Sequence, residues 1–150
     1  MTVECLRVAR SSASALWSVV RCPACAGSLA VGGEARCSPC DALYPLVGGI
    51  WRFVDTERYA GNFGFQWNRH RRTQYDTPSS KPSEAFLAGL GLSADRIGGR
   101  TVVDAGCGAG RYSDVLQRWG GQVIALDLSV AVDACQENLG DRGVVVIQAD

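Results

Sequence analysis

The sequence predicts an α/β protein in which a small cysteine-rich metal-binding segment precedes a β-α-β-α-β unit with parallel strands. Two C-x-x-C pairs near the N-terminus indicate the metal-binding segment. In residues 83–150, compact β-branched runs alternate with segments of helical periodicity, which indicates the β-α-β-α-β order. The strand runs are continuously apolar, as is typical of parallel strands covered on both faces.

Each element of this unit has its own signal. Strands are predicted in RTVVDAG, QVIALD and GVVVIQAD, the third ending at Asp150. Between the first two, apolar residues at i, i+3, i+4 and i+7 form one helix face: Tyr112, Val115, Leu116 and Trp119. A second helix is predicted in SVAVDACQENLG, with Ser129 as its N-terminal cap and Gly140 as its end. A short helix capped by Ser83 is predicted in PSEAFLAGLGL.

The clustered cysteines predict a metal centre made of Cys22, Cys25, Cys37 and Cys40. Each C-x-x-C pair places two thiolates on one tight turn, and eleven residues separate the pairs, so both turns can hold one ion. Four sulfurs suit tetrahedral zinc and leave no open position for catalysis, although iron suits the same cage and one pair alone could act as a redox dithiol. We expect structural zinc. Asp41 follows the second pair, where a glycine would fit more easily.

The stretch VVDAGCGAGRY indicates a strand that runs into a glycine turn and then into a helix. Gly106, Gly108 and Gly110 occupy alternate positions, so backbone N–H groups could approach a ligand without side chains in the way. The G-x-G-x-G spacing differs from the G-x-G-x-x-G fingerprint of dinucleotide-binding proteins. The sequence therefore predicts a ligand site at this turn, but not a pyrophosphate.

Three carboxylates follow the predicted strands. Asp104 lies at the end of the first strand, Asp127 at the end of the second and Asp150 at the end of the third. Because parallel strands present their carboxyl ends together, we expect these side chains at one edge of the sheet. A carboxylate after the second strand is placed to accept hydrogen bonds from both hydroxyls of a ribose. With no evident anion clamp, the pattern favours a nucleoside without phosphates.

Composition limits the classes of function. Fifteen Lys and Arg residues balance fifteen Asp and Glu residues, so the chain lacks the basic footprint of nucleic-acid or anionic-membrane binding. No apolar run has the length of a membrane span. Paired cysteines without a signal peptide indicate a reducing compartment, and we expect a cytoplasmic protein. These properties favour a small-molecule acceptor or substrate over nucleic acid.

Two parts of the chain resemble known families. RCPACAGSLA and CSPCDALYPLVGGIWRF resemble Trm112-like zinc ribbons at the N-terminus of bacterial methyltransferases, with Asp41 as a mild departure. VVDAGCGAGRYSDVL, VIALDLS and VVVIQAD resemble the first three motifs of class I S-adenosylmethionine-dependent methyltransferases, and FGFQWNRH resembles a stretch of their zinc-ribbon members. The resemblance implies an N-terminal zinc ribbon followed by the first βαβαβ half of a Rossmann-like class I methyltransferase fold.

The resemblance also implies contacts with S-adenosylmethionine. The turn Gly106–Gly108 would lie against its methionine part, with Asp104 near the amino group. Asp127 would hold the ribose hydroxyls and Asp150 would reach the adenine amine. Cys107 is expected to be a small packing residue rather than a nucleophile. The cofactor-binding residues expected in this way are Asp104, Gly106, Cys107, Gly108, Gly110, Asp127, Leu128 and Asp150. Neither the methyl acceptor nor a catalytic residue is identified.

The predicted organisation has four parts. An N-terminal extension covers residues 1–15, the Trm112-like zinc ribbon 16–54, an aromatic and basic linker 55–82, and a partial S-adenosylmethionine-binding domain 83–150. Because the family fold has further strands, the chain is expected to be its N-terminal part, with an open sheet edge. One alternative is a non-catalytic zinc-binding interaction module with a vestigial Rossmann-like half and a protein partner at the ribbon. A nicotinamide oxidoreductase is a further alternative that the G-x-G-x-G spacing disfavours.

The remaining features carry weaker expectations. A strand is expected at residues 16–20. Phe65 and Trp67 could cover the cofactor, but packing against the sheet is favoured. His70, the only histidine, is expected to be exposed in a basic patch rather than to act as a base. The other members of that patch, which could meet an anionic substrate or form a solvated face, are Arg69, Arg71 and Arg72.

Overall fold

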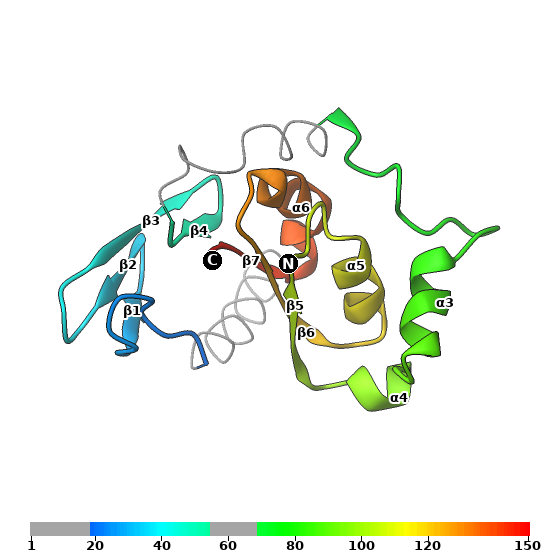
Figure 1. Ribbon diagram of the computed structural model, residues 1–150, viewed down its shortest axis with the longest axis horizontal. Coiled ribbons are helices and arrows are strands. Elements are labelled where there is room, and N and C mark those ends of the chain that lie inside the picture. The colour runs from blue at the N-terminus through cyan, green and yellow to red at the C-terminus, as the bar shows by residue number, and fades with distance from the viewer. Residues whose placement is uncertain (1–18, 55–68) are drawn as a thin grey trace, which may run out of the picture.

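A computed structural model describes residues 19–54 and 69–150 of the chain (Figure 1). In these residues the strands form one mixed sheet with the order β1-β2-β3-β4-β7-β6-β5. The strand expected at 16–20 lies mostly outside the described residues, and Val19 and Val20 are not in a strand. Phe65 and Trp67 lie outside the described residues as well. No helix in the described ranges is long and apolar enough to cross a membrane.

The N-terminal part of the sheet is an antiparallel meander. Gly48 and Gly49 form the two-residue turn between the third and fourth strands of this meander. Their φ angles of 60° and 81° are the positive values that such a hairpin turn requires. The first C-x-x-C pair precedes the first strand, and the second pair lies at the turn after the second strand. The strands are β1 (Leu29–Val31), β2 (Glu34–Cys37), β3 (Leu43–Val47) and β4 (Ile50–Arg52).

The C-terminal part has the predicted β-α-β-α-β order. Its elements are β5 (Thr101–Ala105), α5 (Arg111–Arg118), β6 (Gln122–Asp127), α6 (Ala131–Leu139) and β7 (Val145–Gln148). All three strands are parallel, as predicted. Strand β6 has the predicted bounds, whereas β7 ends at Gln148, so Asp150 lies two residues beyond the strand and not at its end. The parallel unit therefore presents one carboxylate inside β5 and one at the end of β6.

The two parts of the sheet join through β4 and β7, a pairing that the sequence patterns did not predict. The strands run in parallel, with Trp51 opposite Ile147 and Arg52 opposite Gln148. The N–H of Phe53 donates to the carbonyl of Gln148 at 2.8 Å and extends the ladder by one residue. The metal-binding segment is therefore continuous with the parallel strands (Figure 1).

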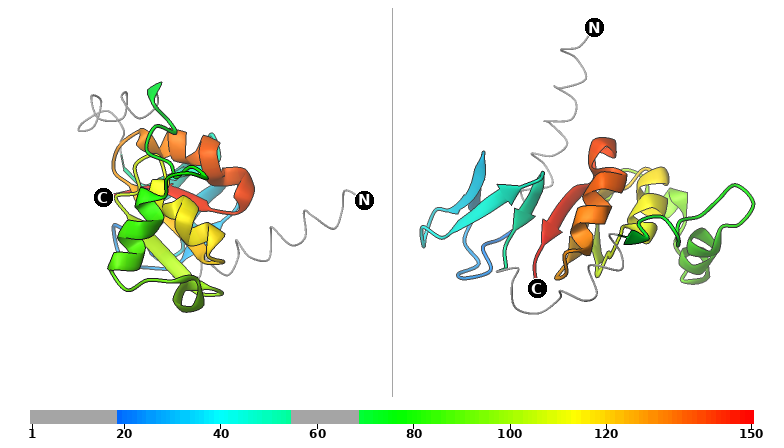
Figure 2. Two further views of the ribbon diagram at one scale, coloured as in Figure 1. Left: turned by 90° about the vertical axis from the view of Figure 1, so that its right-hand side faces the viewer. Right: turned by 90° about the horizontal axis from the view of Figure 1, so that it is seen from above.

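The two faces of the parallel strands are covered differently. Helices α5 and α6 pack on one face (Figure 2), whose floor is formed by alternate strand residues: Val123, Ala125 and Val146. The opposite face shares a second cluster with the N-terminal strands: Ala35, Trp51, Ile124 and Ile147. On the edge strand β5, Val103 remains 57% exposed. The strands were expected to be covered on both faces. Among the described residues, only the face that carries the helices is fully covered.

Helix α3 (Pro82–Gly89) begins with a capping contact that differs from the prediction. Ser83 is not the cap, because it lies buried inside the first turn. The carboxylate of Asp76 takes that role, since it accepts hydrogen bonds from the N–H groups of Ser83 at 2.8 Å and of Glu84 at 3.0 Å. Local capping patterns concern the residue next to the helix, whereas Asp76 lies six residues before Pro82 and reaches the first turn only because the intervening chain folds back.

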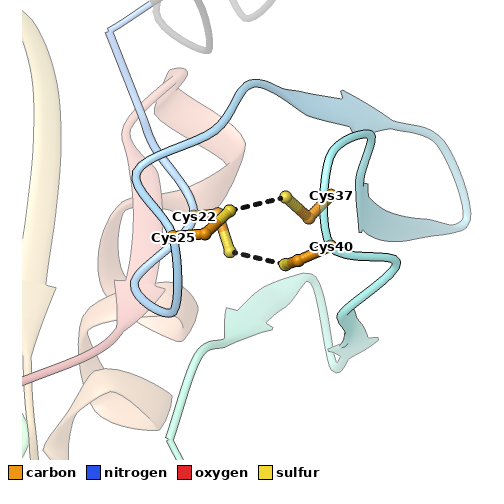
Figure 3. Close-up of side chains that lie close together, drawn as sticks. All are labelled: Cys22, Cys25, Cys37 and Cys40. Atoms are coloured by element: carbon orange, nitrogen blue, oxygen red, sulfur yellow. Dashed lines mark hydrogen bonds between the residues drawn. The ribbon is translucent and has the colours of Figure 1, made fainter.

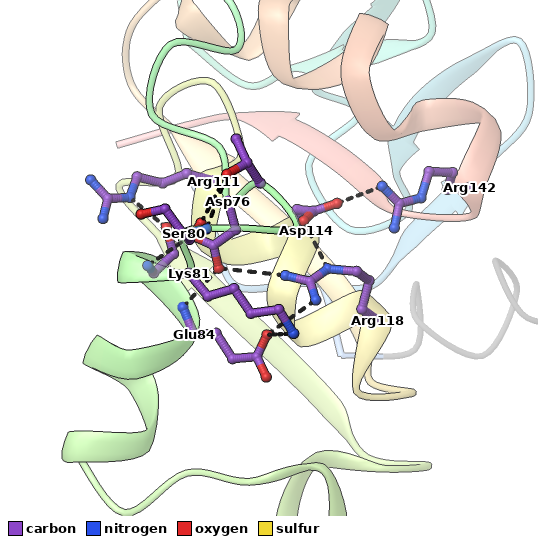
Figure 4. A network of polar contacts seen from close by, with 10 residues as sticks. Asp76, Ser80, Lys81, Glu84, Arg111, Asp114, Arg118 and Arg142 are labelled. Atoms are coloured by element: carbon purple, nitrogen blue, oxygen red, sulfur yellow. Dashed lines mark hydrogen bonds and ion pairs between the residues drawn. The ribbon is translucent and has the colours of Figure 1, made fainter.

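Ion pairs hold α3 against α5 (Figure 4). Arg118 on α5 contacts Asp76 at 3.6 Å and Glu84 at 3.3 Å. Arg118 also contacts Asp114, to which Arg142 binds from the short 3-10 helix η1 (Gly140–Arg142). These contacts fix the helix that starts at the end of the glycine turn.

The end of α6 agrees with the prediction, but its start lies one residue later. Val130 and not Ser129 occupies the N-cap position, although the hydroxyl oxygen of Ser129 accepts a hydrogen bond from the N–H of Ala131, the first residue of the helix, at 3.2 Å. The helix ends at Leu139, and Gly140 opens η1. A further short helix, α4 (Ala94–Ile97), leads into β5 and buries Ile97.

We predict that Asp76→Asn lowers the free energy of unfolding by about 1–2 kcal/mol at pH 7, because the first turn of α3 loses a charged cap. Burial favours the neutral acid, but the hydrogen bonds from Ser83 and Glu84 and the Arg118 charge outweigh burial and lower the pKa of Asp76. The contribution is therefore complete above the unfolded pKa of about 3.9 and is lost as the pH falls through the lower folded pKa. Urea unfolding of both proteins from pH 7 to pH 2.5 measures this. A difference that stays constant down to pH 2.5 would contradict the assignment.

Candidate functional site

The four predicted metal-binding cysteines lie together beside the antiparallel strands (Figure 3). Their sulfur atoms all lie within 4.8 Å of one another. The sulfurs of Cys22 and Cys40 are 3.7 Å apart, and those of Cys25 and Cys37 are 3.4 Å apart. Sulfurs around a tetrahedral zinc, with bonds of about 2.3 Å, lie roughly 3.8 Å apart. The donor atoms and their spacing therefore fit a four-coordinate metal site with no open position.

Each C-x-x-C pair is closed by the same backbone hydrogen bond. The N–H of Ala26 donates to the carbonyl of Cys22 at 2.8 Å, and the N–H of Asp41 donates to that of Cys37 at 3.0 Å. Ala26 and Asp41 both have a φ of 58°, in the left-handed region that glycine adopts most easily. The expectation that a glycine would fit more easily than Asp41 is confirmed by this conformation.

Gly27 lies where the two pairs approach each other. A Cβ atom at this position would lie 2.6 Å from Cγ of Pro39 and 3.1 Å from Sγ of Cys25. A side chain here would therefore force the two turns apart. The glycine lets them converge on one ion.

Tyr44 on β3 adds a polar contact to the cluster. Its hydroxyl lies 3.1 Å from Sγ of Cys22. This hydrogen bond lowers the pKa of Cys22 to about 6, because the donor stabilises the thiolate. At Cys37, burial raises the pKa to about 12. A bound cation would supply the charge that lets all four sulfurs ionise together.

We predict that Gly27→Ala lowers the affinity for zinc about tenfold or more, because moving one turn away from Pro39 widens the cage. Gly33→Ala is the matched control, since a Cβ at Gly33 meets nothing within 4 Å. Competition with a chromogenic chelator measures both affinities, and metal analysis of the purified proteins identifies the ion. Equal zinc affinities for the two variants would contradict the role given to Gly27.

The glycine turn connects β5 to α5 through three residues in left-handed conformations. The φ angles of Gly106, Gly108 and Gly110 are 80°, 53° and 91°. A Cβ at Gly110 would in addition lie 2.8 Å from both Sγ of Cys135 and Cδ1 of Leu139 on α6. The alternation seen in the sequence is thus a requirement of the backbone and of the close approach of α6.

The backbone N–H groups of the turn are used differently from the expectation. Those of Gly106 and Cys107 donate to the carbonyl of Leu126 on β6 at 2.8 and 3.0 Å. That of Gly108 donates to the carboxylate of Asp127 at 2.8 Å. These three groups therefore hold the turn against β6 and do not form a cradle for a phosphate.

Asp127 is held between the turn and the loop that follows β6. One carboxylate oxygen accepts from the N–H of Gly108, and the other accepts from the N–H of Ser129 at 2.8 Å and from its hydroxyl at 2.7 Å. A carboxylate has about four acceptor positions, so about one remains. The orientation of this half-buried group is thus fixed before any ligand binds.

Asp104 lies close to the turn inside β5. Its carboxylate accepts a hydrogen bond from the hydroxyl of Ser113 on α5 at 2.6 Å. Burial raises the pKa of Asp104, and the negative charge of Asp127 raises it further. The two carboxylates therefore form an electronegative pair beside the glycine turn.

Cys107 is a buried thiol that contacts a second thiol, Cys135. This contact and burial raise the pKa of Cys107, so its sulfur stays protonated at neutral pH. Its side chain is 4% exposed. These properties agree with the expectation of a packing residue and not of a nucleophile.

A pocket of about 200 Å³ opens beside the turn. Residues 106–109 of the turn form one wall of this pocket. The segment before α3 covers the turn, because the hydroxyl of Tyr75 donates a hydrogen bond to the carbonyl of Ala109 at 2.7 Å. The contact of Gln74 and Tyr75 with the turn was not predicted, because this segment has no periodicity and its basic residues were expected to form a solvated face. The other lining residues are Arg71, Gln74, Arg111 and Tyr112.

The three predicted carboxylates differ in their place in the strands. Asp104 and Asp127 lie at the turn, whereas Asp150 is exposed and lies two residues beyond β7, after Ala149, whose N–H donates to the carbonyl of Asp127 at 3.1 Å. Asp150 lines a cavity of about 240 Å³ together with Val103 and Ile124. Leu128 lies in the loop after Asp127, where its carbonyl accepts a hydrogen bond. The structure thus brings Asp104 and Asp127 together at the turn, and the contact of Asp150 with a ligand stays a prediction.

Part of the basic patch is anchored to α6. Arg71 forms an ion pair with Glu137. The side chain of Asn138 accepts from Nε of Arg72 at 3.1 Å and donates to the carbonyl of Arg71 at 3.0 Å. These contacts hold the segment that closes the pocket, a role that the expectation of a solvated face did not include. His70 is exposed, as expected.

Comparison with known proteins adds one finding. Residues 103–150 match a protein-family model described as a methyltransferase domain. The match begins in β5 and includes the glycine turn, both helices of the parallel unit and β7. None of the curated proteins matches the chain. The parallel unit therefore has the pattern of a methyltransferase domain, and the match does not extend to the four-cysteine segment.

Proposed function

We propose that the chain is a methyltransferase that uses S-adenosylmethionine as its methyl donor, and that residues 16–54 form a structural zinc ribbon. The observation that carries the proposal is the carboxylate of Asp127, fixed against the glycine turn by the N–H of Gly108. This geometry combines an acceptor for ribose hydroxyls with a backbone surface free of large side chains. The family match over residues 103–150 supports the same assignment.

The polar groups of the turn favour this ligand over a dinucleotide. The N–H groups of Gly106, Cys107 and Gly108 bind inside the protein, so they offer nothing to a pyrophosphate. Asp104 and Asp127 lie nearby and would repel phosphate oxygens. Of the two arginines that line the pocket in the described ranges, Arg71 is paired with Glu137, which leaves the charge of Arg111 against two carboxylates. S-adenosylmethionine has no phosphate, and its sulfonium and ammonium groups are cationic, so the same carboxylates attract it.

When bound, S-adenosylmethionine supplies a methyl group activated by its positive sulfur. The chain's own contribution is to bind and align, which accounts for most of the catalysis in a direct transfer between two aligned groups. Asp127 would accept a ribose hydroxyl at its remaining acceptor position, and a second one would require the Ser129 hydroxyl to release the carboxylate. Asp104 would accept from the ammonium group, whose charge would offset the raised pKa of this carboxyl. The balanced charge of the chain favours a small-molecule acceptor over nucleic acid.

The ribbon is proposed to bind zinc for structural reasons. Its four sulfurs fill a tetrahedral coordination sphere, so no position is left for a substrate or a reactive water. The free thiols of the buried Cys107 and Cys135 fit a reducing compartment, which we propose is the cytoplasm.

Binding of S-adenosylhomocysteine, measured by isothermal titration calorimetry, tests the proposed function. We expect binding by the zinc-loaded chain, and a loss of about 30-fold or more in Asp127→Ala, because hydrogen bonds to a charged group are removed. Asp141→Ala removes an exposed carboxylate from η1 and serves as the matched control with unchanged affinity.

Parallel titration with NAD separates the alternatives. Tight NAD binding would contradict the proposal and indicate a nicotinamide-dependent enzyme instead. Absence of binding for both ligands would overturn it in favour of a non-catalytic zinc-binding module. S-adenosylhomocysteine binding that Asp127→Ala leaves intact would place the nucleoside elsewhere.

A further inference from the structure

We propose that Arg52, at the end of the ribbon strand β4, is a positioning residue for the nucleoside site and acts through Gln148 and the carbonyl of Leu128. This inference rests on the proposed function, because it assigns the ribbon a part in the affinity for the adenosyl ligand. It follows from contacts that link β4, β7 and the loop after β6, none of which the sequence patterns indicated.

The guanidinium of Arg52 connects two elements of the parallel unit. Its Nη1 donates to Oε1 of Gln148 on β7 at 2.7 Å. Its Nη2 donates to the carboxylate of Asp133 in the first turn of α6. The Arg52 side chain is only 12% exposed, so these bonds form away from most of the solvent, which strengthens them and makes their loss costly.

Gln148 connects Arg52 to the loop that follows the ligand-binding carboxylate. Its side chain is 1% exposed and both ends of its amide are paired, because Nε2 donates to the carbonyl of Leu128 at 2.9 Å. Leu128 directly follows Asp127, and Ser129 holds the Asp127 carboxylate through two hydrogen bonds. The orientation of Asp127 thus depends on where Gln148 holds this loop.

Arg52 restrains this loop at both of its ends. It reaches Leu128 through Gln148, and it reaches α6, which begins at Ala131, through Asp133. The loop between these points contains Ser129, so its backbone cannot shift without breaking one of the two connections. A displaced loop would leave Asp127 less well aligned with two ribose hydroxyls. The ribbon therefore contributes to nucleoside affinity without touching the ligand.

The first experiment compares S-adenosylhomocysteine affinities by calorimetry in the zinc-loaded full chain. Arg52→Met keeps the apolar stem and removes the donors, and we expect about tenfold weaker binding with unchanged zinc content. Arg52→Lys retains a donor and should recover part of the affinity. Gln148→Glu keeps the acceptor for Arg52 but loses the donor to Leu128, so it should weaken binding as Arg52→Met does. Arg36→Met removes an exposed ribbon arginine that pairs with Asp41, and should change nothing.

A double-mutant cycle distinguishes positioning from general destabilisation. If Arg52 acts by orienting Asp127, then Arg52→Met should cost about threefold or less in an Asp127→Asn background, instead of about tenfold. A purely structural role would give the same loss in both backgrounds. All affinities are measured at a temperature well below each variant's thermal unfolding midpoint. If Arg52→Met does not fold, the affinity of Gln148→Glu tests the positioning role instead.

The outcomes separate this inference from the proposed function. If the wild type binds and both Arg52→Met and Gln148→Glu bind within twofold of it, the positioning role is overturned while the methyltransferase proposal stands. Equal losses in both backgrounds of the cycle also overturn the positioning role. If the wild type binds no S-adenosylhomocysteine, the proposed function fails and this inference fails with it.

Discussion

The parallel pairing of β4 with β7 is the constraint on which the arrangement of the two parts of the chain depends. It places Trp51 opposite Ile147 and Arg52 opposite Gln148, so the four-cysteine ribbon continues the sheet that carries the glycine turn. In the described ranges only β4 is hydrogen-bonded to the parallel strands, because β1, β2 and β3 pair within the ribbon. The metal cluster and the carboxyl edge of the parallel strands therefore belong to one continuous sheet.

At the carboxyl edge, charge and backbone geometry select the same kind of ligand. The turn uses its N–H groups to bind β6 and Asp127, which removes an anion site but fixes the carboxylate. Asp104 adds a second negative group in a partly buried position. This combination supports the proposal of a cationic nucleoside over a phosphorylated one. The buried thiol of Cys107 completes the packing beneath the turn.

Periodicity and motif spacing predicted the elements whose causes are local. The bounds of β6, the end of α6 at Gly140 and the four-cysteine cluster agree with the structure because each depends on a few neighbouring residues. Contacts between segments distant in sequence were missed. Asp76 replaces Ser83 as the cap of α3, and the β4–β7 pairing depends on how two separate units dock. The strand ends likewise differ from the prediction, since Asp104 lies inside β5, Asp127 at the end of β6 and Asp150 two residues beyond β7.

The most direct test of the account is a titration of the isotopically labelled chain with S-adenosylhomocysteine, followed by amide NMR spectra. The amides of Gly108 and Ser129 both donate to the carboxylate of Asp127, so they report on the proposed ribose contact. We expect both resonances to shift and saturate together, while the resonance of the Ala26 amide in the ribbon stays in place. Unchanged Gly108 and Ser129 resonances at saturating ligand, or shifts confined to the ribbon, would contradict it.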